Sequence, residues 1–116
     1  MTYKKILLDS CLVKEWKKHK FNLYALVAEE VPSFSFFFLD SLLSELLLSD
    51  REFLNKNKVL ILKTGSTVKG DKGLLTFLKQ SKEEHLVFTV DFPFFKLLGS
   101  KGMFFDLKKR RIKKIY

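Results

Sequence analysis

Short apolar runs alternate along this chain with segments whose apolar residues recur at helical spacing, and no other feature constrains the fold as strongly. The runs lie at 6–8, 33–39, 59–62, 86–90 and 103–107. Their apolar residues are mostly consecutive, which is typical of strands covered on both faces of a parallel sheet. The 116 residues suit one domain. We therefore expect a single three-layer α/β/α domain over residues 1–116, with a central parallel sheet of about five strands.

The segments between the runs predict the helical layers. Apolar residues at helical spacing favour helices that start after Asp9, over 21–30, over 41–48, from Asp71 to about residue 81, and over 92–98. Pro32 ends the second of these helices. The polar and basic segment 50–58 predicts a loop or the frayed end of a helix. Strands and helices thus alternate along the whole chain, as parallel strands require.

Carboxylates follow the predicted strands at their carboxyl ends. Asp9 comes directly after the first run, Asp91 comes directly after the fourth, and Glu45 and Asp71 lie on the neighbouring predicted helices. In a parallel sheet these ends share one edge, where ligands bind. We therefore expect the four acids to face one crevice. Taken singly, Asp9, Asp40, Asp71 and Asp91 serve equally well as helix caps, and Glu45 as a solvated helix residue.

A set of oxygen ligands without histidine or cysteine suits Mg²⁺ or Mn²⁺. Such an ion activates water and neutralises charge on a phosphodiester. The formal net charge of +9 indicates an anionic partner, namely RNA, DNA or an anionic membrane surface, although a lysine-rich coding bias would also produce it. Of these we expect nucleic acid.

The C-terminal segment 108–116 is the densest basic run. We expect it to contact RNA phosphates, or to act as a nuclear address in a eukaryote; the alternative is a solvated, frayed terminus. Its cations are Lys108, Lys109, Arg110, Arg111, Lys113 and Lys114.

Cysteine content and hydropathy indicate the cellular compartment. Cys11 is the only cysteine, so the chain cannot form an internal disulfide or a cysteine-based zinc site. No apolar run is long enough for a signal-peptide core or a membrane span. We expect a protein of the cytoplasm without a membrane partner, nuclear or nucleolar if the source is eukaryotic.

Five segments together resemble the PIN-domain nucleases. Residues 5–11 (Lys-Ile-Leu-Leu-Asp-Ser-Cys) resemble the opening strand of that family, and residues 39–46 resemble the helix that carries its glutamate. Residues 70–74 resemble the start of its third acidic helix, residues 88–91 (Phe-Thr-Val-Asp) its fourth strand, and residues 101–107 its last strand. Asp40 before Glu45, the Thr-Val-Asp sequence and the basic tail look most like the PIN domains of small-subunit ribosomal RNA processing.

The resemblance implies a metal-dependent endoribonuclease that hydrolyses RNA, with precursor ribosomal RNA as its substrate class. By the same resemblance, Asp9, Glu45, Asp71 and Asp91 would be the catalytic ligands of Mg²⁺ or Mn²⁺, supported through hydroxyl hydrogen bonds by Ser10 and Thr89. Cys11 stands where the family usually has asparagine, and Pro93 where some relatives have an acid, which leaves room for a weakened site. A non-catalytic RNA- or protein-binding module, a PIN-type toxin and a homodimer stay open as alternatives.

Overall fold

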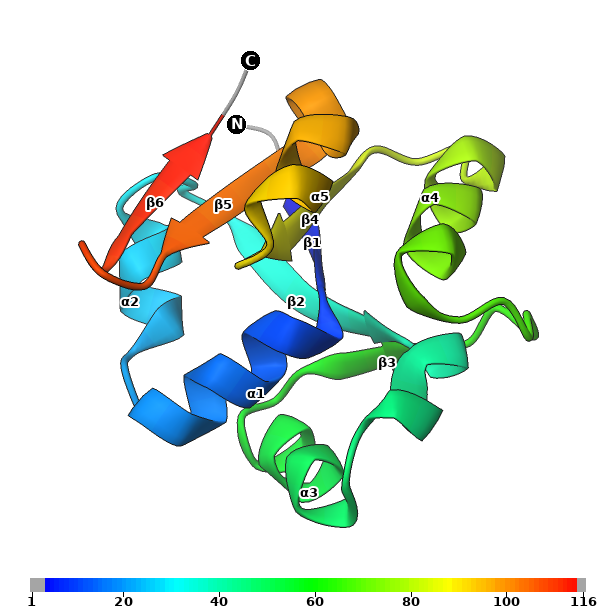
Figure 1. The fold of residues 1–116 in the computed structure, drawn as a ribbon, viewed down its shortest axis with the longest axis horizontal. Coiled ribbons are helices and arrows are strands. Elements are labelled where there is room, and N and C mark those ends of the chain that lie inside the picture. The colour runs from blue at the N-terminus through cyan, green and yellow to red at the C-terminus, as the bar shows by residue number, and fades with distance from the viewer. Residues whose placement is uncertain (1–3, 115–116) are drawn as a thin grey trace.

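Six strands form one sheet in the order β3-β2-β1-β4-β5-β6 (Figure 1) in the computed structural model, which describes residues 4–114. The strands β1 (Lys4–Leu8), β2 (Phe34–Leu39), β3 (Leu60–Leu62), β4 (His85–Thr89) and β5 (Gly102–Asp106) are parallel. β6 (Arg111–Lys114) runs antiparallel to β5. The predicted α/β class and parallel sheet are confirmed, and a sixth strand is added to the five expected.

The sixth strand was not predicted, and it shows that the alternative of a frayed terminus does not hold for residues 111–114. Asp106 turns the chain back, because its carboxylate accepts the backbone N–H groups of Lys108 and Lys109 at 3.0 and 3.2 Å. Arg110 completes the turn with a φ of 50°, in the left-handed region. Ile112, half-buried, then packs against the core opposite Phe105. β6 thus has one half-buried apolar side chain between exposed basic neighbours, as an antiparallel edge strand with one solvated face does.

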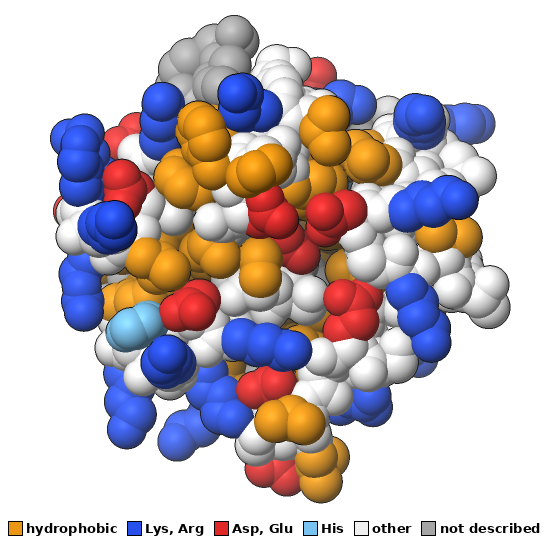
Figure 2. All heavy atoms as spheres, in the orientation of Figure 1, with side chains coloured by type: hydrophobic (Ala, Val, Ile, Leu, Met, Phe, Trp, Pro, Cys, Tyr) orange, Lys and Arg blue, Asp and Glu red, His pale blue; other side chains and the backbone are white. Residues whose placement is uncertain are grey.

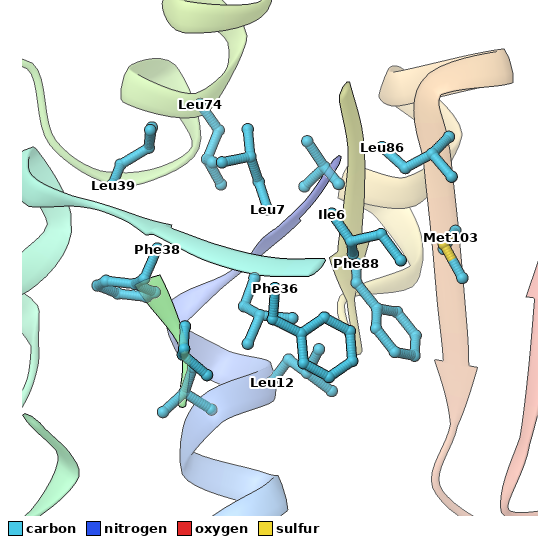
Figure 3. Close-up of a cluster of buried hydrophobic side chains, with 14 of the residues drawn as sticks. Ile6, Leu7, Leu12, Phe36, Phe38, Leu39, Leu74, Leu86, Phe88 and Met103 are labelled. Atoms are coloured by element: carbon cyan, nitrogen blue, oxygen red, sulfur yellow. The ribbon is translucent and has the colours of Figure 1, made fainter. Parts of the chain in front are cut away.

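Helices cover both faces of the sheet. They are α1 (Ser10–His19), α2 (Leu23–Ala28), α3 (Leu48–Lys56), α4 (Gly70–Gln80) and α5 (Phe92–Leu98), with short 3₁₀ helices η1 (Asp40–Glu45) and η2 (Gly99–Lys101). In Figure 3, Leu12 of α1 lies with Phe36 on one side of β2, and Leu74 of α4 lies with Leu39 on the other. The three predicted layers are present, and the consecutive apolar residues of the strands serve both interfaces.

The prediction for 41–58 was wrong. Residues 40–45 form a 3₁₀ helix, and most of the segment expected to be a loop or the frayed end of a helix belongs to a separate helix, α3. Asp50 explains the change: its buried carboxylate accepts the Leu47 N–H at 3.0 Å and pairs with Lys17 of α1 at 3.1 Å. Leu54 of the same helix is buried. This tertiary anchoring stabilises a helix whose polar sequence would not predict one.

Within residues 4–114, no helix combines the length and apolar character that crossing a bilayer requires.

Candidate active site

Asp9 and Asp91 follow the adjacent strands β1 and β4, and Thr89 links them. The register pairs Leu8 with Phe88, and the Asp9 N–H donates to the Phe88 carbonyl at 3.0 Å, so Asp9 continues the parallel ladder. The fully buried Thr89 hydroxyl donates to Asp9 Oδ2 at 2.7 Å and accepts the Asp91 N–H at 3.0 Å. One hydroxyl thus fixes the side chain of one acid and the backbone of the other.

Asp9 stands at the N-cap position of α1 but does not cap it. Its side chain forms no capping hydrogen bond. Instead, Oδ2 accepts hydrogen bonds from Thr89 and, at 3.2 Å, from the Cys11 thiol. Asp9 is only 5% exposed. The cap interpretation is therefore wrong for Asp9, whose carboxylate is directed to the sheet edge.

Asp91 is a helix cap and also a candidate ligand. It is the N-cap of α5, and its Oδ1 accepts the Phe94 N–H at 3.1 Å. Among the described residues no partner is recorded for the second oxygen, Oδ2. The two interpretations of Asp91 are thus compatible, because one oxygen caps the helix and the other remains for a ligand.

Glu45 ends η1 and binds groups from two other segments. Its Oε1 accepts the Ser10 hydroxyl at 3.1 Å, and its Oε2 accepts the Gly70 N–H at 2.8 Å. These contacts tie η1 to the first residue of α1 and the first residue of α4. Gly70 has a φ of 67°, a conformation that favours glycine. The backbone of Gly70 was not anticipated as a donor; its position just before Asp71 was the only sequence signal.

Asp71 lies in the first turn of α4, exposed to solvent, and Lys69 rather than Asp71 is the N-cap. Partial removal from water raises the pKa of Asp71 above its ordinary value of 3.8. The negative charges of Asp9, Asp91 and Glu45 raise the same pKa further. All three other acids therefore lie within electrostatic range of Asp71.

Acidic side chains accordingly gather near the middle of one face, with lysine and arginine side chains around its margin (Figure 2). The donor chemistry fits Mg²⁺ or Mn²⁺. Within residues 4–114, however, no three aspartate, glutamate, histidine or cysteine side chains converge into a closed metal-binding group. Like charges repel one another, and Asp9 and Glu45 are turned toward their own hydrogen-bond donors. The arrangement is an open acidic cluster.

Asp40, also weighed as a cap, holds a loop. Its two carboxylate oxygens accept the N–H and hydroxyl of Thr64 at 3.0 and 2.8 Å, and Oδ2 also accepts the Gly65 N–H at 3.3 Å. Burial opposes ionisation, but these hydrogen bonds and one from the Ser41 N–H hold the pKa of Asp40 below 3.8. Asp40 therefore fixes the connection from β3 to α4, which presents Asp71.

Cys11 is not a nucleophile in this setting. Burial raises the pKa of its thiol to about 12, and the Asp9 carboxylate adds to the effect. The thiol donates to Asp9 and lies 3.6 Å from Thr89 Oγ1, so it occupies the space beside the acid without supplying an anion.

The predicted RNA-binding cations lie in the β5–β6 turn and on β6. Lys108, Lys109, Arg110, Arg111 and Lys113 are exposed, whereas the side chain of Lys114 lies outside the described residues. The Nζ of Lys113 lies 5.7 Å from the ring centre of Phe92, the residue after Asp91. Neither Phe92 nor Lys96, whose Nζ lies 5.5 Å from the same ring, was predicted from the sequence as a site residue.

No protein-family model matches the chain, and no curated protein matches its sequence. Among solved structures it is similar to a mutant of T5 5'-exonuclease, with a TM-score of 0.53 and 14% identity. The match covers 97% of this chain and 54% of that chain, so this chain spans about half the length of the exonuclease. The likeness confirms the predicted α/β fold with a central, mostly parallel sheet. The narrower resemblance to ribosomal RNA-processing domains stays a prediction.

Proposed function

We propose that this protein is a nuclease that uses Mg²⁺ or Mn²⁺ to hydrolyse RNA phosphodiester bonds. One observation carries the proposal: Thr89 links Asp9 to Asp91 by hydrogen bonds, and Glu45 binds Ser10 and Gly70, the residues next to Asp9 and Asp71. The charges of Asp9, Asp91 and Glu45 also raise the pKa of Asp71, in a chain whose net charge is +9. Such a concentration of like charge is unfavourable without a cation, and a divalent ion relieves it.

Asp9, Glu45, Asp71 and Asp91 would hold the ion. Because Mg²⁺ keeps several of its waters, an open cluster can bind it partly through water, without all four acids as direct ligands. The bound ion would supply a water of lowered pKa and stabilise charge on the phosphate. Thr89 fixes the Asp9 carboxylate and Ser10 the Glu45 carboxylate. The exposure of Asp71 leaves the cluster open to substrate.

The basic surface supports RNA as the substrate. The exposed cations of 108–113 would bind phosphates and hold the strand near the cluster. From the resemblance of the five segments we infer endonucleolytic cleavage, with precursor ribosomal RNA as the substrate class. The similar solved structure is named as a 5'-exonuclease, which makes removal of terminal nucleotides the competing mode. A circular single-stranded RNA distinguishes the modes, because only an endonuclease can open it.

Asp91→Asn tests the activity with little risk to the fold. Asparagine caps helices as well as aspartate does, so α5 keeps its first hydrogen bond while the site loses one charge. We expect Mn²⁺-dependent cleavage of single-stranded RNA to fall at least about 100-fold, as loss of one electrostatic contact to the transition state commonly costs. The matched control is Glu84→Gln, an exposed acid just before the opposite end of β4. Equal cleavage by both variants and the unmodified protein would refute the proposal.

A second candidate is a module that binds RNA without cleaving it. Both Glu45 oxygens and one Asp9 oxygen already accept hydrogen bonds from the protein, so these side chains are held without a cation. This function predicts RNA binding with the same affinity in Mn²⁺ and in EDTA, and no cleavage product. The assay of Asp91→Asn therefore separates the two candidates.

A further inference from the structure

Phe92 is the one exposed phenylalanine of the 13 in the chain, all of which lie within residues 4–114. It is 42% exposed, whereas Phe94 and Phe95 of the same helix are buried. Phe92 directly follows Asp91, at the first position of α5. A large apolar ring is thus presented to solvent by the residue that follows Asp91.

Two neighbouring rings hold Phe92 in place. Its ring centre lies 5.3 Å from that of Phe104 of β5, at an interplanar angle of 70°. The ring of Phe95 lies 6.0 Å away at 38°. Edge-to-face and tilted contacts of this kind fix the orientation of a ring. Phe92 is therefore ordered before any ligand arrives, which lowers the entropic cost of binding to it.

Two ammonium groups lie over the same ring. Lys96 Nζ lies 5.5 Å and Lys113 Nζ 5.7 Å from the ring centre. Both lysines are exposed, and within residues 4–114 neither forms an ion pair with a carboxylate. They come from α5 and β6, 17 positions apart in the sequence (113 minus 96). Their long side chains can move from the ring to a phosphate without a backbone change.

An exposed, pre-ordered aromatic ring with adjacent cations has the features by which proteins bind single-stranded nucleic acid. We propose that Phe92 stacks against one base of a single strand, while Lys96 and Lys113 bind the phosphates on either side of that base. The stacked nucleotide would lie next to the phosphodiester at Asp91 and position it. This inference rests on the proposed function and names its substrate class as unpaired nucleic acid. A duplex, whose bases are already stacked, would not satisfy the site.

The test is equilibrium binding in EDTA, where no cleavage complicates the measurement. The probes are a fluorescent 12-nucleotide oligouridine and an abasic strand of the same length, followed by anisotropy. We expect Phe92→Ala to weaken oligouridine binding by about 10- to 100-fold, the range for loss of one stacked base, and to leave the abasic strand unchanged. Phe92→Tyr should retain the affinity. Leu97→Ala, which removes a side chain 72% exposed on the same helix, is the control and should change neither.

The lysines give an independent readout. Lys96→Gln and Lys113→Gln should weaken both probes equally, and each should lower the slope of log affinity against log salt by about 0.7. A Phe92→Trp variant adds a spectroscopic measure, since oligouridine should quench its fluorescence and the abasic strand should not. Equal effects of Phe92→Ala on both probes, or none on either, would overturn the proposal. The outcome is separate from the proposed function, because binding in EDTA can be measured whether or not Asp91→Asn alters cleavage.

Discussion

The hydroxyl of Thr89 joins two strand ends, so its removal should be among the most costly single-atom changes in the protein. Thr89→Val keeps the volume and the branched shape of the side chain. It removes the donor to Asp9 Oδ2 at 2.7 Å and the acceptor of the Asp91 N–H at 3.0 Å. Thr89 is fully buried, so water cannot easily replace either partner.

The magnitude follows from these two contacts. A hydrogen bond to a charged group contributes about 1.5–3 kcal/mol, and a backbone N–H left unpaired costs about 1–3 kcal/mol when buried. Asp91 is only half-buried, so the second cost lies at the lower end. We expect Thr89→Val to lower the free energy of unfolding by about 3 kcal/mol. For a domain of this size the unfolding temperature should fall by roughly 12 °C.

Urea unfolding, followed by far-ultraviolet circular dichroism and by the fluorescence of the buried Trp16, measures this change. Thr89→Ser keeps the hydroxyl and loses only a buried methyl group, at about 1 kcal/mol. The control is Thr76→Val, a half-buried threonine of α4 for which the structure records no side-chain hydrogen bond among the described residues. A free energy of unfolding for Thr89→Val within about 1 kcal/mol of that for Thr76→Val would contradict this expectation, as would a serine variant less stable than the valine variant.

Three further changes test other parts of the structure. The raised pKa of Asp71 means that its negative charge disfavours the folded state above pH 3.8. Asp71→Asn should therefore unfold at a higher temperature in EDTA at pH 7, with a gain in stability of less than about 1 kcal/mol that vanishes as the pH falls below 3.8. A lower unfolding temperature for this variant would contradict the expectation. Burial opposes the charge of Asp50, but its hydrogen bonds hold its pKa below 3.8. Asp50→Ala should therefore lower the free energy of unfolding by about 2 kcal/mol at pH 7, and the two proteins should become equally stable as acid protonates Asp50 in the folded state. A constant difference in stability down to pH 2 would refute this. A thiol with a pKa of about 12 should leave Cys11 unreactive toward a disulfide reagent at pH 8 until urea unfolds the chain, and rapid labelling of the folded protein would contradict the burial of that side chain.

The arrangement of strands was predictable because its signals are local. The apolar runs, consecutive along the chain, marked strands covered on both faces, and five of the six strands were found at the expected places. The sequence also shows directly that acids follow β1 and β4. Parallel strands share one carboxyl edge, so the approach of Asp9 to Asp91 follows from topology alone.

The sequence could not decide what each carboxylate binds. Asp9 follows a strand and precedes a helix, where local chemistry favours capping, yet its oxygen accepts from Thr89, 80 residues away. Asp91 occupies the same kind of position and does cap its helix. The choice depends on which donor the packing brings within reach, and for Asp9 that donor comes from the neighbouring strand.

Tertiary structure also decided the regions whose own sequence is polar. The ion pair between Asp50 and Lys17 of another helix stabilises α3, and the packing of Ile112 against the core stabilises β6. The approach of Lys113 to Phe92, beside the acidic cluster, depends on that same strand pairing. The spacing of apolar residues along the chain shows which face of a segment can be buried. Whether a polar segment is ordered, and what its side chains face, depends on contacts between distant residues that only folding brings together.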